Sequence, residues 1–207
     1  STLYWDLRYE SQSPVSLKSK APKNIYQGYD FGRMALPGKY SVKGYQVVRG
    51  KVTELTEAEE FTVKFLELNK QMGYDRSGIE TFAKEVADAR NLLGKLNNVS
   101  KDFGKRVKFM QQAVLATPKA DRMLIENLTQ IQEQLNNLNI KLFGDGSIAK
   151  REIETAPSIN NRIGTVVYYL WRTTSSPTAT QTEQVKIAQA DLKFVEDELK
   201  TIKTQLI

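Results

Sequence analysis

Histidine and cysteine are both absent from the 207 residues, and their absence excludes several classes of chemistry. Thiolate nucleophiles, disulfides, zinc fingers, histidine-ligated metal sites and Ser-His-Asp catalysis all need one of these two residues. Apolar runs are also short, and none approaches the ~20 residues that a membrane-spanning helix needs. We therefore expect no catalytic, cofactor-binding or metal-binding residue in this chain, and no membrane span.

Charge of one sign is not concentrated along the chain either. The 30 Lys and Arg residues against 24 Asp and Glu residues give a net charge of +6, spread over the whole length. Nucleic-acid binding normally shows as a basic patch on one face, so we expect no nucleic-acid partner. The length is sufficient for a real core, because a chain of this size buries roughly 70% of its extended surface on folding.

The most regular stretch runs from Ser77 to Thr117 and predicts one very long helix. Ser77 and Glu80 form a capping-box pattern at its start, and Pro118 ends it. At about 1.5 Å per residue the helix is roughly 60 Å long, so more than one helix must pack along it. Apolar residues follow at steps of three and four, with Ser100 as the polar exception, at Ile79, Phe82, Val86, Ala89, Leu93, Leu96, Phe103, Val107, Met110 and Val114.

Three further stretches carry the same apolar spacing. We predict helices over residues 118–143, 158–173 and 180–206, with apolar stripes such as the one from Leu124 to Leu142. Helices with apolar stripes and short connections pack side by side. The sequence therefore predicts an antiparallel four-helix bundle over residues 73–207.

Turn and cap signals set the ends of these helices. Thr117-Pro118 is expected to cap the first of the three, because proline is favoured at the first helical position. The glycine-flanked Asp145 ends it, Ser158 caps the second, and Thr180-x-x-Glu183 is a capping box for the third. The predicted connections are therefore a tight turn at residue 117, a charged loop, and a short break.

The residues before the long helix alternate between apolar and polar, which predicts strands. They are expected to form a small antiparallel β-sandwich, partial and immunoglobulin-like, over residues 1–72. Arg49-Gly50 is a plausible hairpin turn, and Ser11–Leu36 reads as a surface loop with a short extended piece near Ile25–Phe31. The predicted strands are Leu3–Tyr9, Lys39–Val48, Lys51–Leu55 and Glu60–Leu66.

Two parts of this assignment have competing interpretations. Residues 56–72 also fit a backward extension of the heptad pattern, but Gly73 and Gly78 would then lie inside the helix at about 1 kcal/mol each. We prefer the strand. Leu3–Tyr9 is taken as an interior strand whose neighbours are missing. Its free edge is therefore expected either to pair with a second copy of the chain in a homodimer or to be covered by the loop Ser11–Leu36.

One group of charged residues is a candidate binding surface. Lys101, Lys105 and Lys108 share one face of the long helix, and Arg106 lies nearby. Such a stripe can bind an acidic partner. The simpler interpretation is a solvated outer face, because no aromatic residues are interleaved for base stacking.

Other candidate sites have simpler explanations. Asp145 resembles part of a calcium loop, but no further oxygen ligands follow at the required spacing. The glycosylation sequons Asn98–Ser100 and Asn127–Thr129 lie in predicted helices rather than in surface loops. Trp5 and Trp171 have rings that can stack on a sugar, although aromatic residues on amphipathic faces usually belong to the core.

Several blocks of sequence together resemble a known family. They lie at Trp5–Tyr9, Leu36–Val42, Glu60–Val63, Thr117–Asp121, Pro157–Gly164 and Ser176–Gln181. In this order they resemble the C-terminal region of bacterial sortilin-like, Asp-box (BNR) β-propeller proteins, which are described as glycosyl hydrolases or sialidase-like. The blocks Trp5–Tyr9 and Pro157–Gly164 are the most specific. The resemblance covers nearly the whole chain.

The resemblance implies a function that the residues alone do not. In that family a β-propeller precedes this region and holds any catalytic site, and no Asp-box motif occurs here. Glycoside hydrolysis needs two carboxylates at a controlled separation, and no such pair stands out. We therefore expect a non-catalytic C-terminal accessory or interaction module that contacts the propeller of the same polypeptide. The resemblance also implies a secreted protein of the periplasm or cell surface of a Bacteroidetes-like bacterium.

A second function is kept open. The chain also fits a free-standing helical binding module that uses the face of Lys101 to Lys108 for an acidic partner. Salt-sensitive binding to polyanions would favour this alternative.

Overall fold

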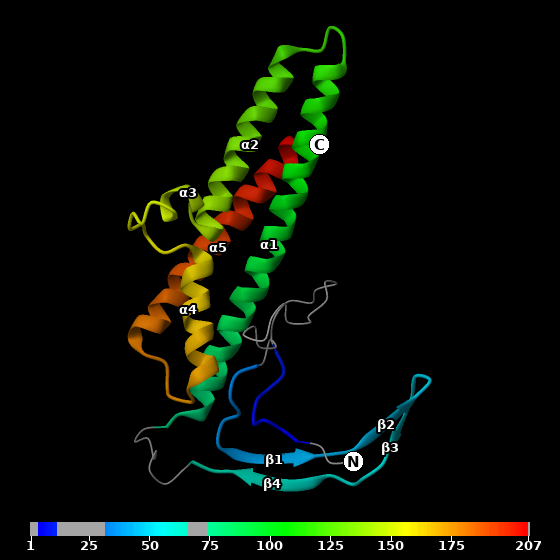
Figure 1. Ribbon diagram of the computed structural model, residues 1–207, viewed down its shortest axis with the longest axis vertical. Helices are drawn as coiled ribbons and strands as arrows, with labels where there is room; N and C mark the ends of the chain where they lie inside the picture. Colours follow the sequence, from blue (N-terminus) through cyan, green and yellow to red (C-terminus); the bar gives the residue numbers. More distant parts are fainter. Residues whose placement is uncertain (1–3, 12–31, 66–73, 207) are drawn as a thin grey trace.

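The chain is mostly helical, with a small antiparallel β region before the helices (Figure 1). The computed structural model describes residues 4–11, 32–65 and 74–206. The extended piece predicted near Ile25–Phe31 lies outside the described residues, as does the predicted end of the last strand at Leu66.

The long helix α1 spans Arg76–Ala116, 41 residues, and its predicted bounds are correct to within one residue. The predicted cap is wrong. The carboxylate of Asp75 accepts a hydrogen bond from the Gly78 N–H at 3.0 Å, whereas Glu80 forms an ion pair with Arg76 at 2.9 Å. Asp and Ser are equally favourable at the N-cap position. Asp75 can therefore replace Ser77 as the cap, and the helix starts earlier in the chain.

The second helix, α2, spans Arg122–Phe143, so the predicted start at Pro118 is wrong. Thr117 closes α1 instead, because its hydroxyl donates to the Ala113 carbonyl at 2.7 Å. Lys119 takes a left-handed conformation with φ of 66°, and the Asp121 carboxylate accepts from the Met123 N–H at 2.9 Å. A loop therefore reverses the direction of the chain after α1, and Asp121 caps the start of α2.

The three remaining helices are α3, Gly146–Ala149, α4, Ile159–Arg172, and α5, Ala179–Gln205. The bounds of α4 and α5 were predicted to within one residue, whereas the single turn α3 was not predicted. Ser158 caps α4 as expected. At α5 the capping box consists of Thr178 and Gln181 rather than the predicted Thr180 and Glu183.

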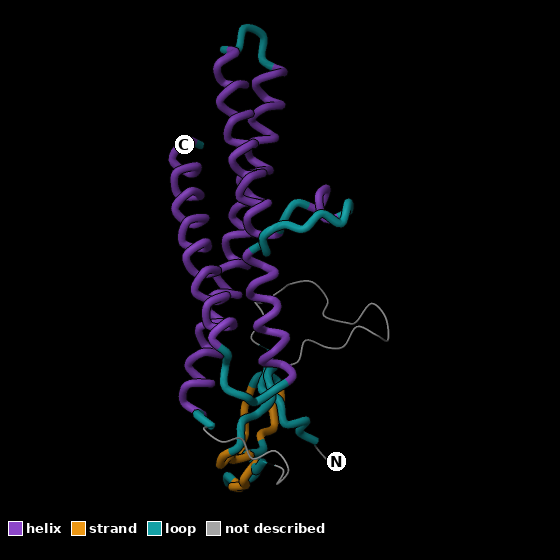
Figure 2. Tube along the Cα trace, turned by 90° about the vertical axis from the view of Figure 1, so that its left-hand side faces the viewer, coloured by secondary structure: helices purple, strands orange, loops and turns teal. Residues whose placement is uncertain are grey.

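The helices pack in an arrangement that differs from four helices side by side. Figures 1 and 2 show α2 and α4 following each other along α1, and α5 running in the same direction as α1. One buried cluster joins α1, α2, α5 and the start of α4, around residues such as Val107, Leu142 and Leu192. A second joins α1, α4 and α5 around Phe82 and Val166. The paired ends of α1 and α2 continue beyond the end of α5.

The β region is a two-stranded ribbon built from two short sheets. β1, Gly38–Val42, pairs with β4, Glu59–Val63, and β2, Tyr45–Val48, pairs with β3, Lys51–Glu54, all antiparallel. The predicted turn at Arg49-Gly50 is confirmed, and both residues have positive φ, as a type I′ turn requires. The predicted strand Glu60–Leu66 is confirmed over Glu60–Val63, against the helical alternative.

The predicted strand Lys39–Val48 is interrupted where the ribbon passes from one sheet to the other. The Gly44 N–H donates to the Thr56 hydroxyl at 2.9 Å, and the Gly44 carbonyl accepts from the Leu55 N–H at 2.9 Å. Each described strand pairs with a single neighbour. The strands that would complete the predicted sandwich are therefore not among those described.

The predicted strand Leu3–Tyr9 is wrong over its described part, residues 4–9, which holds only a single bridge between Arg8 and Met34. Leu7 has φ of 58°, outside the strand region. The Asp6 carboxylate accepts from the Arg8 N–H at 3.0 Å, and the Trp5 indole N–H donates to the Arg8 carbonyl at 2.7 Å. These local bonds compete with strand pairing, which the alternating pattern did not reveal.

Candidate functional site

The outer half of the ribbon presents an apolar face to water. Val47 lies opposite Val52, and Tyr45 lies opposite Glu54, so these four side chains project from the same face. Tyr45, Val47 and Val52 are 54%, 66% and 62% exposed. We call these three residues the ribbon face. A two-stranded ribbon is at best marginally stable alone, so this face is a candidate surface for a partner.

The inner half of the ribbon is covered by the N-terminal segment. The Trp5 ring lies 5.4 Å from the Tyr40 ring and 5.8 Å from the Phe61 ring, measured between centroids. Tyr40 and Phe61 are opposite each other in the β1–β4 register and stack at 5.9 Å. The two halves of the ribbon therefore differ in that only the inner half has an aromatic cover among the described residues.

An arginine at the start of α1 fixes the ribbon to the helices. The Arg76 guanidinium donates to the Pro37 carbonyl at 3.0 Å and lies 5.6 Å from the Tyr40 ring centroid. It passes so close to Gly38 that a Cβ there would lie 1.6 Å from Nη1. Glycine at position 38 is therefore needed for the guanidinium to reach the ribbon.

A pair of tyrosines lies beside this arginine. The Tyr40 hydroxyl donates to the Leu36 carbonyl and lies 2.9 Å from the Tyr9 hydroxyl. Partial burial, followed by the hydrogen bond with Tyr9, raises the pKa of Tyr40 to about 12, although the nearby Arg76 and Arg33 act in the opposite direction. Tyr40 therefore keeps its proton, and with it the bond to Leu36, well above neutral pH.

Another arginine ties the N-terminal segment to α4. The Arg8 guanidinium donates to the Trp171 carbonyl at 2.8 Å and lies 4.5 Å above the Trp171 ring. Backbone hydrogen bonds from Tyr9 to Arg33 and from Ala35 to Leu7 complete the contact. Together with Arg76, these residues form the joint between ribbon and helices. Sequence reasoning missed the joint, because its members are far apart in the chain.

The two tryptophans therefore both lie at the joint. Trp5 is 42% exposed and Trp171 is 37% exposed, so neither belongs to the buried core that the sequence favoured. Each ring has an aromatic neighbour, since Trp171 stacks on Tyr168 at 6.4 Å. Their role in this structure is to connect segments.

The basic stripe on α1 is exposed, as both of its interpretations require. Lys101, Lys105 and Lys108 are exposed on α1, and none of them forms an ion pair with a described residue. Arg106 instead pairs with Asp102 at 2.9 Å. The three lysines therefore remain available to an acidic partner.

The remaining sequence candidates have structural roles. The Asp145 carboxylate caps α3 by accepting from the Ser147 N–H and hydroxyl, and these bonds lower its pKa. Within the described ranges, no group of His, Cys, Asp and Glu residues that suits a metal ion is present. Asn98 and Asn127 lie within α1 and α2, as predicted.

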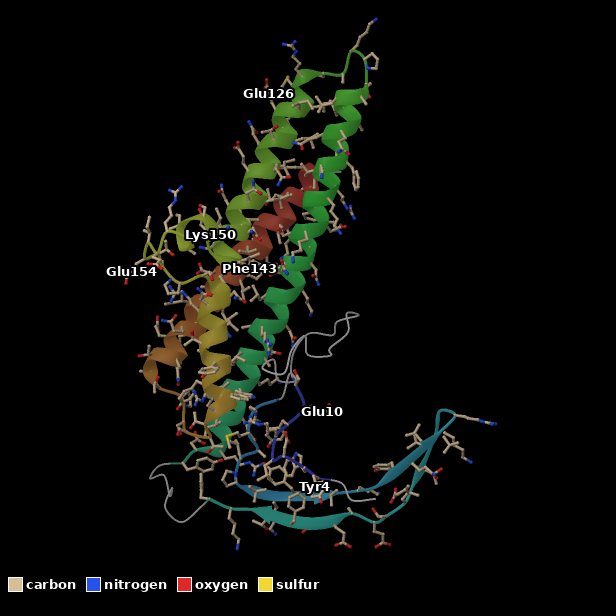
Figure 3. The ribbon with its side chains drawn as sticks, viewed as in Figure 1. Tyr4, Glu10, Glu126, Phe143, Lys150 and Glu154 are labelled. Atoms are coloured by element: carbon tan, nitrogen blue, oxygen red, sulfur yellow. The ribbon has the colours of Figure 1, made fainter. Side chains whose placement is uncertain are left out.

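A groove of about 1070 Å³ lies where the loop carrying α3 meets α4 and α5. Figure 3 labels Phe143, Lys150 and Glu154 around this loop. Arg162 in the groove donates to the Gln184 side chain. Of the described lining residues only Asp145 is acidic, so the groove holds no carboxylate pair of the kind glycoside hydrolysis needs.

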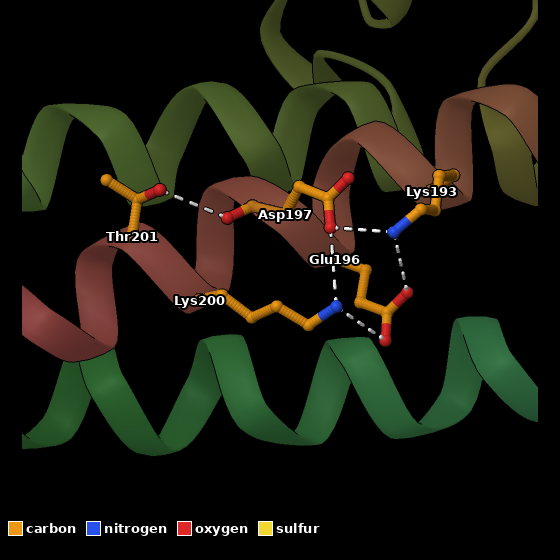
Figure 4. Close-up of polar contacts among 5 residues, drawn as sticks. All are labelled: Lys193, Glu196, Asp197, Lys200 and Thr201. Carbon is orange, nitrogen blue, oxygen red and sulfur yellow. Dashed lines mark hydrogen bonds and ion pairs between the residues drawn. The ribbon is translucent and has the colours of Figure 1, made fainter.

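Figure 4 shows a network of charges on α5. Lys193 and Lys200 both contact Asp197, at 2.8 and 3.3 Å, and both also contact Glu196. The hydrogen bond from Lys193 is the main reason that the pKa of Asp197 is lowered. Each lysine lies three or four residues, about one helical turn, from both carboxylates, so the network is an exposed one that stabilises the helix.

Comparisons with known proteins give no match. No protein family, no curated protein and no solved structure is significantly similar to this chain. Across the described residues, no helix is both long enough and apolar enough to cross a membrane. The resemblance to sortilin-like β-propeller proteins stays a prediction.

Proposed function

We propose that the chain is a non-catalytic accessory and interaction module of a larger exported protein, of the sortilin-like β-propeller, glycosyl-hydrolase type. The observation that carries the proposal is the ribbon face of Tyr45, Val47 and Val52, three large apolar side chains on one exposed face. Burying them against a partner is favourable at about 25 cal/mol per Å² of apolar area.

The partner is the β-propeller that precedes this region in the resembling proteins. Trp5 packs on Tyr40 and Phe61, so a domain preceding Tyr4 would enter beside the ribbon. The helices supply a rigid support, and the joint at Arg8 and Arg76 holds the ribbon to it. In this proposal the propeller supplies the β layer that the ribbon lacks.

We also propose how the ribbon and the helices are completed in the parent protein. Strands contributed by the preceding region would complete an immunoglobulin-like sandwich on the ribbon, with a boundary near residue 72. The helices α1, α2, α4 and α5 would act as one unit, with α2 and α4 antiparallel to α1 and α5, and the module would be located in the periplasm or at the cell surface. Residues 4–9 do not form a strand, which removes the reason for expecting a homodimer through residues 3–9.

The test is to compare this chain with the parent protein that includes the propeller. Val47→Asp and Val52→Asp should lower the melting temperature of the parent by several degrees and leave that of this chain nearly unchanged. Thr53→Asp is the matched control, because Thr53 lies on the opposite face of β3. Equal effects of Val52→Asp and Thr53→Asp in the parent would contradict docking through the ribbon face.

A separate assay tests the absence of catalysis. The purified chain is incubated with chromogenic glycosides, including sialosides, and no turnover is expected. Turnover that disappears on changing a single Asp or Glu of this chain would overturn the proposal.

The alternative, a free-standing binding module, has one supporting observation. Lys101, Lys105 and Lys108 are exposed and unpaired among the described residues. Binding to heparin that weakens steeply with salt, and that is lost in the triple Lys→Gln variant, would favour it. Lys84→Gln, also exposed on α1, is the control for a general charge effect.

A further inference from the structure

A small cavity lies beside the joint, between α1, α4 and the segment that follows the N-terminal region. Its volume is about 50 Å³, space for a few water molecules or one small ion. Ala83 and Ala87 leave the space on the α1 side, and Gly32 borders it on the other. The full lining is Gly32, Arg33, Ala83, Val86, Ala87, Arg90, Val167, Leu170 and Trp171.

The first arginine of this cavity has buried donors without acceptors. Nε and Nη1 of Arg33 are both buried, and neither has a hydrogen-bond partner among the described residues. The Arg33 guanidinium carbon lies 4.3 Å from the Tyr9 ring centroid, but an aromatic ring is a weaker hydrogen-bond acceptor than an oxygen and does not replace one. A buried charged donor without an acceptor is strongly unfavourable. An acceptor bound in the cavity would therefore stabilise the Arg33 side chain.

A second arginine lines the same cavity. Arg90 comes from α1, and no described carboxylate forms an ion pair with it, in contrast to Arg76 and Arg106. Two positive charges around one small cavity with apolar walls repel each other unless an anion lies between them. A guanidinium binds carboxylate and phosphate oxygens with paired N–H donors, so the geometry suits an oxyanion.

The walls of the cavity are fixed by further contacts. The Arg8 guanidinium donates to the Gly32 carbonyl at 3.3 Å and to the Trp171 carbonyl at 2.8 Å, which joins two sides of the cavity. The third side is α1. An occupant bound by Arg33 and Arg90 would therefore connect the joint to α1 directly.

We propose that Arg33 and Arg90 bind one small oxyanion, a phosphate or a carboxylate, in this cavity, and that the bound anion stabilises the joint between ribbon and helices. The site is independent of the ribbon face and of any activity of a parent protein. Its ligand is identified by chemistry alone, as a tetrahedral or planar oxyanion small enough for about 50 Å³.

The experiment measures binding of inorganic phosphate, sulfate and acetate to the purified chain by isothermal titration calorimetry. Thermal unfolding in each salt, against chloride at the same ionic strength, gives a second readout. We expect one site per chain and a rise in melting temperature with phosphate, sulfate or acetate that chloride does not produce. Phosphate against acetate separates the two kinds of oxyanion.

Two variants and a control decide the assignment. Arg90→Gln should weaken binding at least tenfold, and it keeps a folded chain because Arg90 makes no ion pair with a described residue. Arg33→Gln should do the same, and Arg172→Gln, which contacts Tyr168 on α4, should leave binding unchanged. Circular dichroism confirms the fold of each variant.

Three results would overturn the proposal. The first is no binding of any of the three anions to the native chain. The second is an affinity that Arg90→Gln leaves unchanged. The third is an affinity that Arg33→Gln leaves unchanged.

Discussion

The helices and the ribbon use their apolar residues in opposite ways. Every fully buried hydrophobic side chain among the described residues belongs to a helix, except Ala35 and Leu36. Every residue of β2 and β3 is exposed, including Val47, Val48 and Val52. The helices thus have a buried core, whereas the outer half of the ribbon leaves its apolar side chains in water.

Helices and strands differ in how their backbone hydrogen bonds are made and how their apolar side chains are covered. A helix forms its backbone hydrogen bonds internally and needs cover on one stripe only, which α2, α4 and α5 provide for α1. A strand needs neighbours at its edges and a layer on its apolar face. A two-stranded ribbon provides neither in full, so the apolar side chains of its outer half are left in water.

The largest predicted effect comes from introducing a carboxylate into the helical core, compared with introducing one on the ribbon face. Leu93→Asp should cost at least ~3 kcal/mol of unfolding free energy, because it buries an unpaired carboxylate in the core. Val52→Asp should cost less than about 0.5 kcal/mol in this chain, because the side chain is in water. Urea unfolding followed by circular dichroism measures both.

The comparison fails if the two substitutions cost the same. A loss below ~1 kcal/mol for Leu93→Asp would mean that the α1 stripe is not core. A large loss for Val52→Asp in this chain would mean that the ribbon face already has a cover.

A smaller effect is expected at the joint between the two parts. A Cβ at Gly32 would lie 2.1 Å from the Tyr9 carbonyl oxygen, so Gly32→Ala must push the N-terminal segment away. We expect a loss of about 1–3 kcal/mol. Hydrogen exchange should become faster at Tyr9 and Ala35, whose amides bond across the joint, and stay slow at Leu93.

Gly104→Ala is the matched control for that substitution. Gly104 lies inside α1 with nothing within 4 Å of the new methyl group, so the change should stabilise the chain by about 0.4–1 kcal/mol. If Gly32→Ala also stabilises, the close approach at the joint is wrong.

The smallest effect is a pH dependence at the joint. The pKa of Tyr40 is about 12 in the folded chain, raised mainly by burial from an ordinary value near 10. Folding therefore favours the protonated hydroxyl. Its contribution to stability is complete below the unfolded pKa near 10 and is lost as the pH rises through about 12.

Ultraviolet titration measures this shift. Tyr40 should ionise later than an ordinary tyrosine, and Tyr40→Phe should reduce the late component by one tyrosine. Burial also raises the pKa of Tyr74, so a late component that survives Tyr40→Phe unchanged would assign it to Tyr74 and contradict the prediction for Tyr40.

Helix positions were predictable because their signal is local and repeated. The stripe from Ile79 to Val114 predicted α1 to within one residue at each end, and Ser158 marked the start of α4. Cap residues were less predictable. Several side chains near each start can cap, and Asp75 and Asp121 were chosen over Ser77 and Thr117 by the geometry of the preceding turn.

The N-terminal segment shows where a pattern misleads. The alternation from Leu3 to Tyr9 predicts a strand, but Asp6 and Trp5 bond to Arg8, and Leu7 is left-handed. These bonds become favourable because Trp5 packs on Tyr40 and Phe61, residues from the distant ribbon. Period-two spacing carries no information about that contact.

By itself, the sequence determined where the four longer helices lie, most of the residues that face the core, and the position of the Arg49-Gly50 turn, because each depends on neighbours within a few residues. Met110 and Leu124, which the apolar spacing assigned to the stripes, are exposed instead. Only the tertiary structure decided that α4 continues the line of α2 along α1, and that Arg8, Arg33 and Arg76 meet at one joint. These placements depend on contacts between residues far apart in the chain, whose energies no local pattern records.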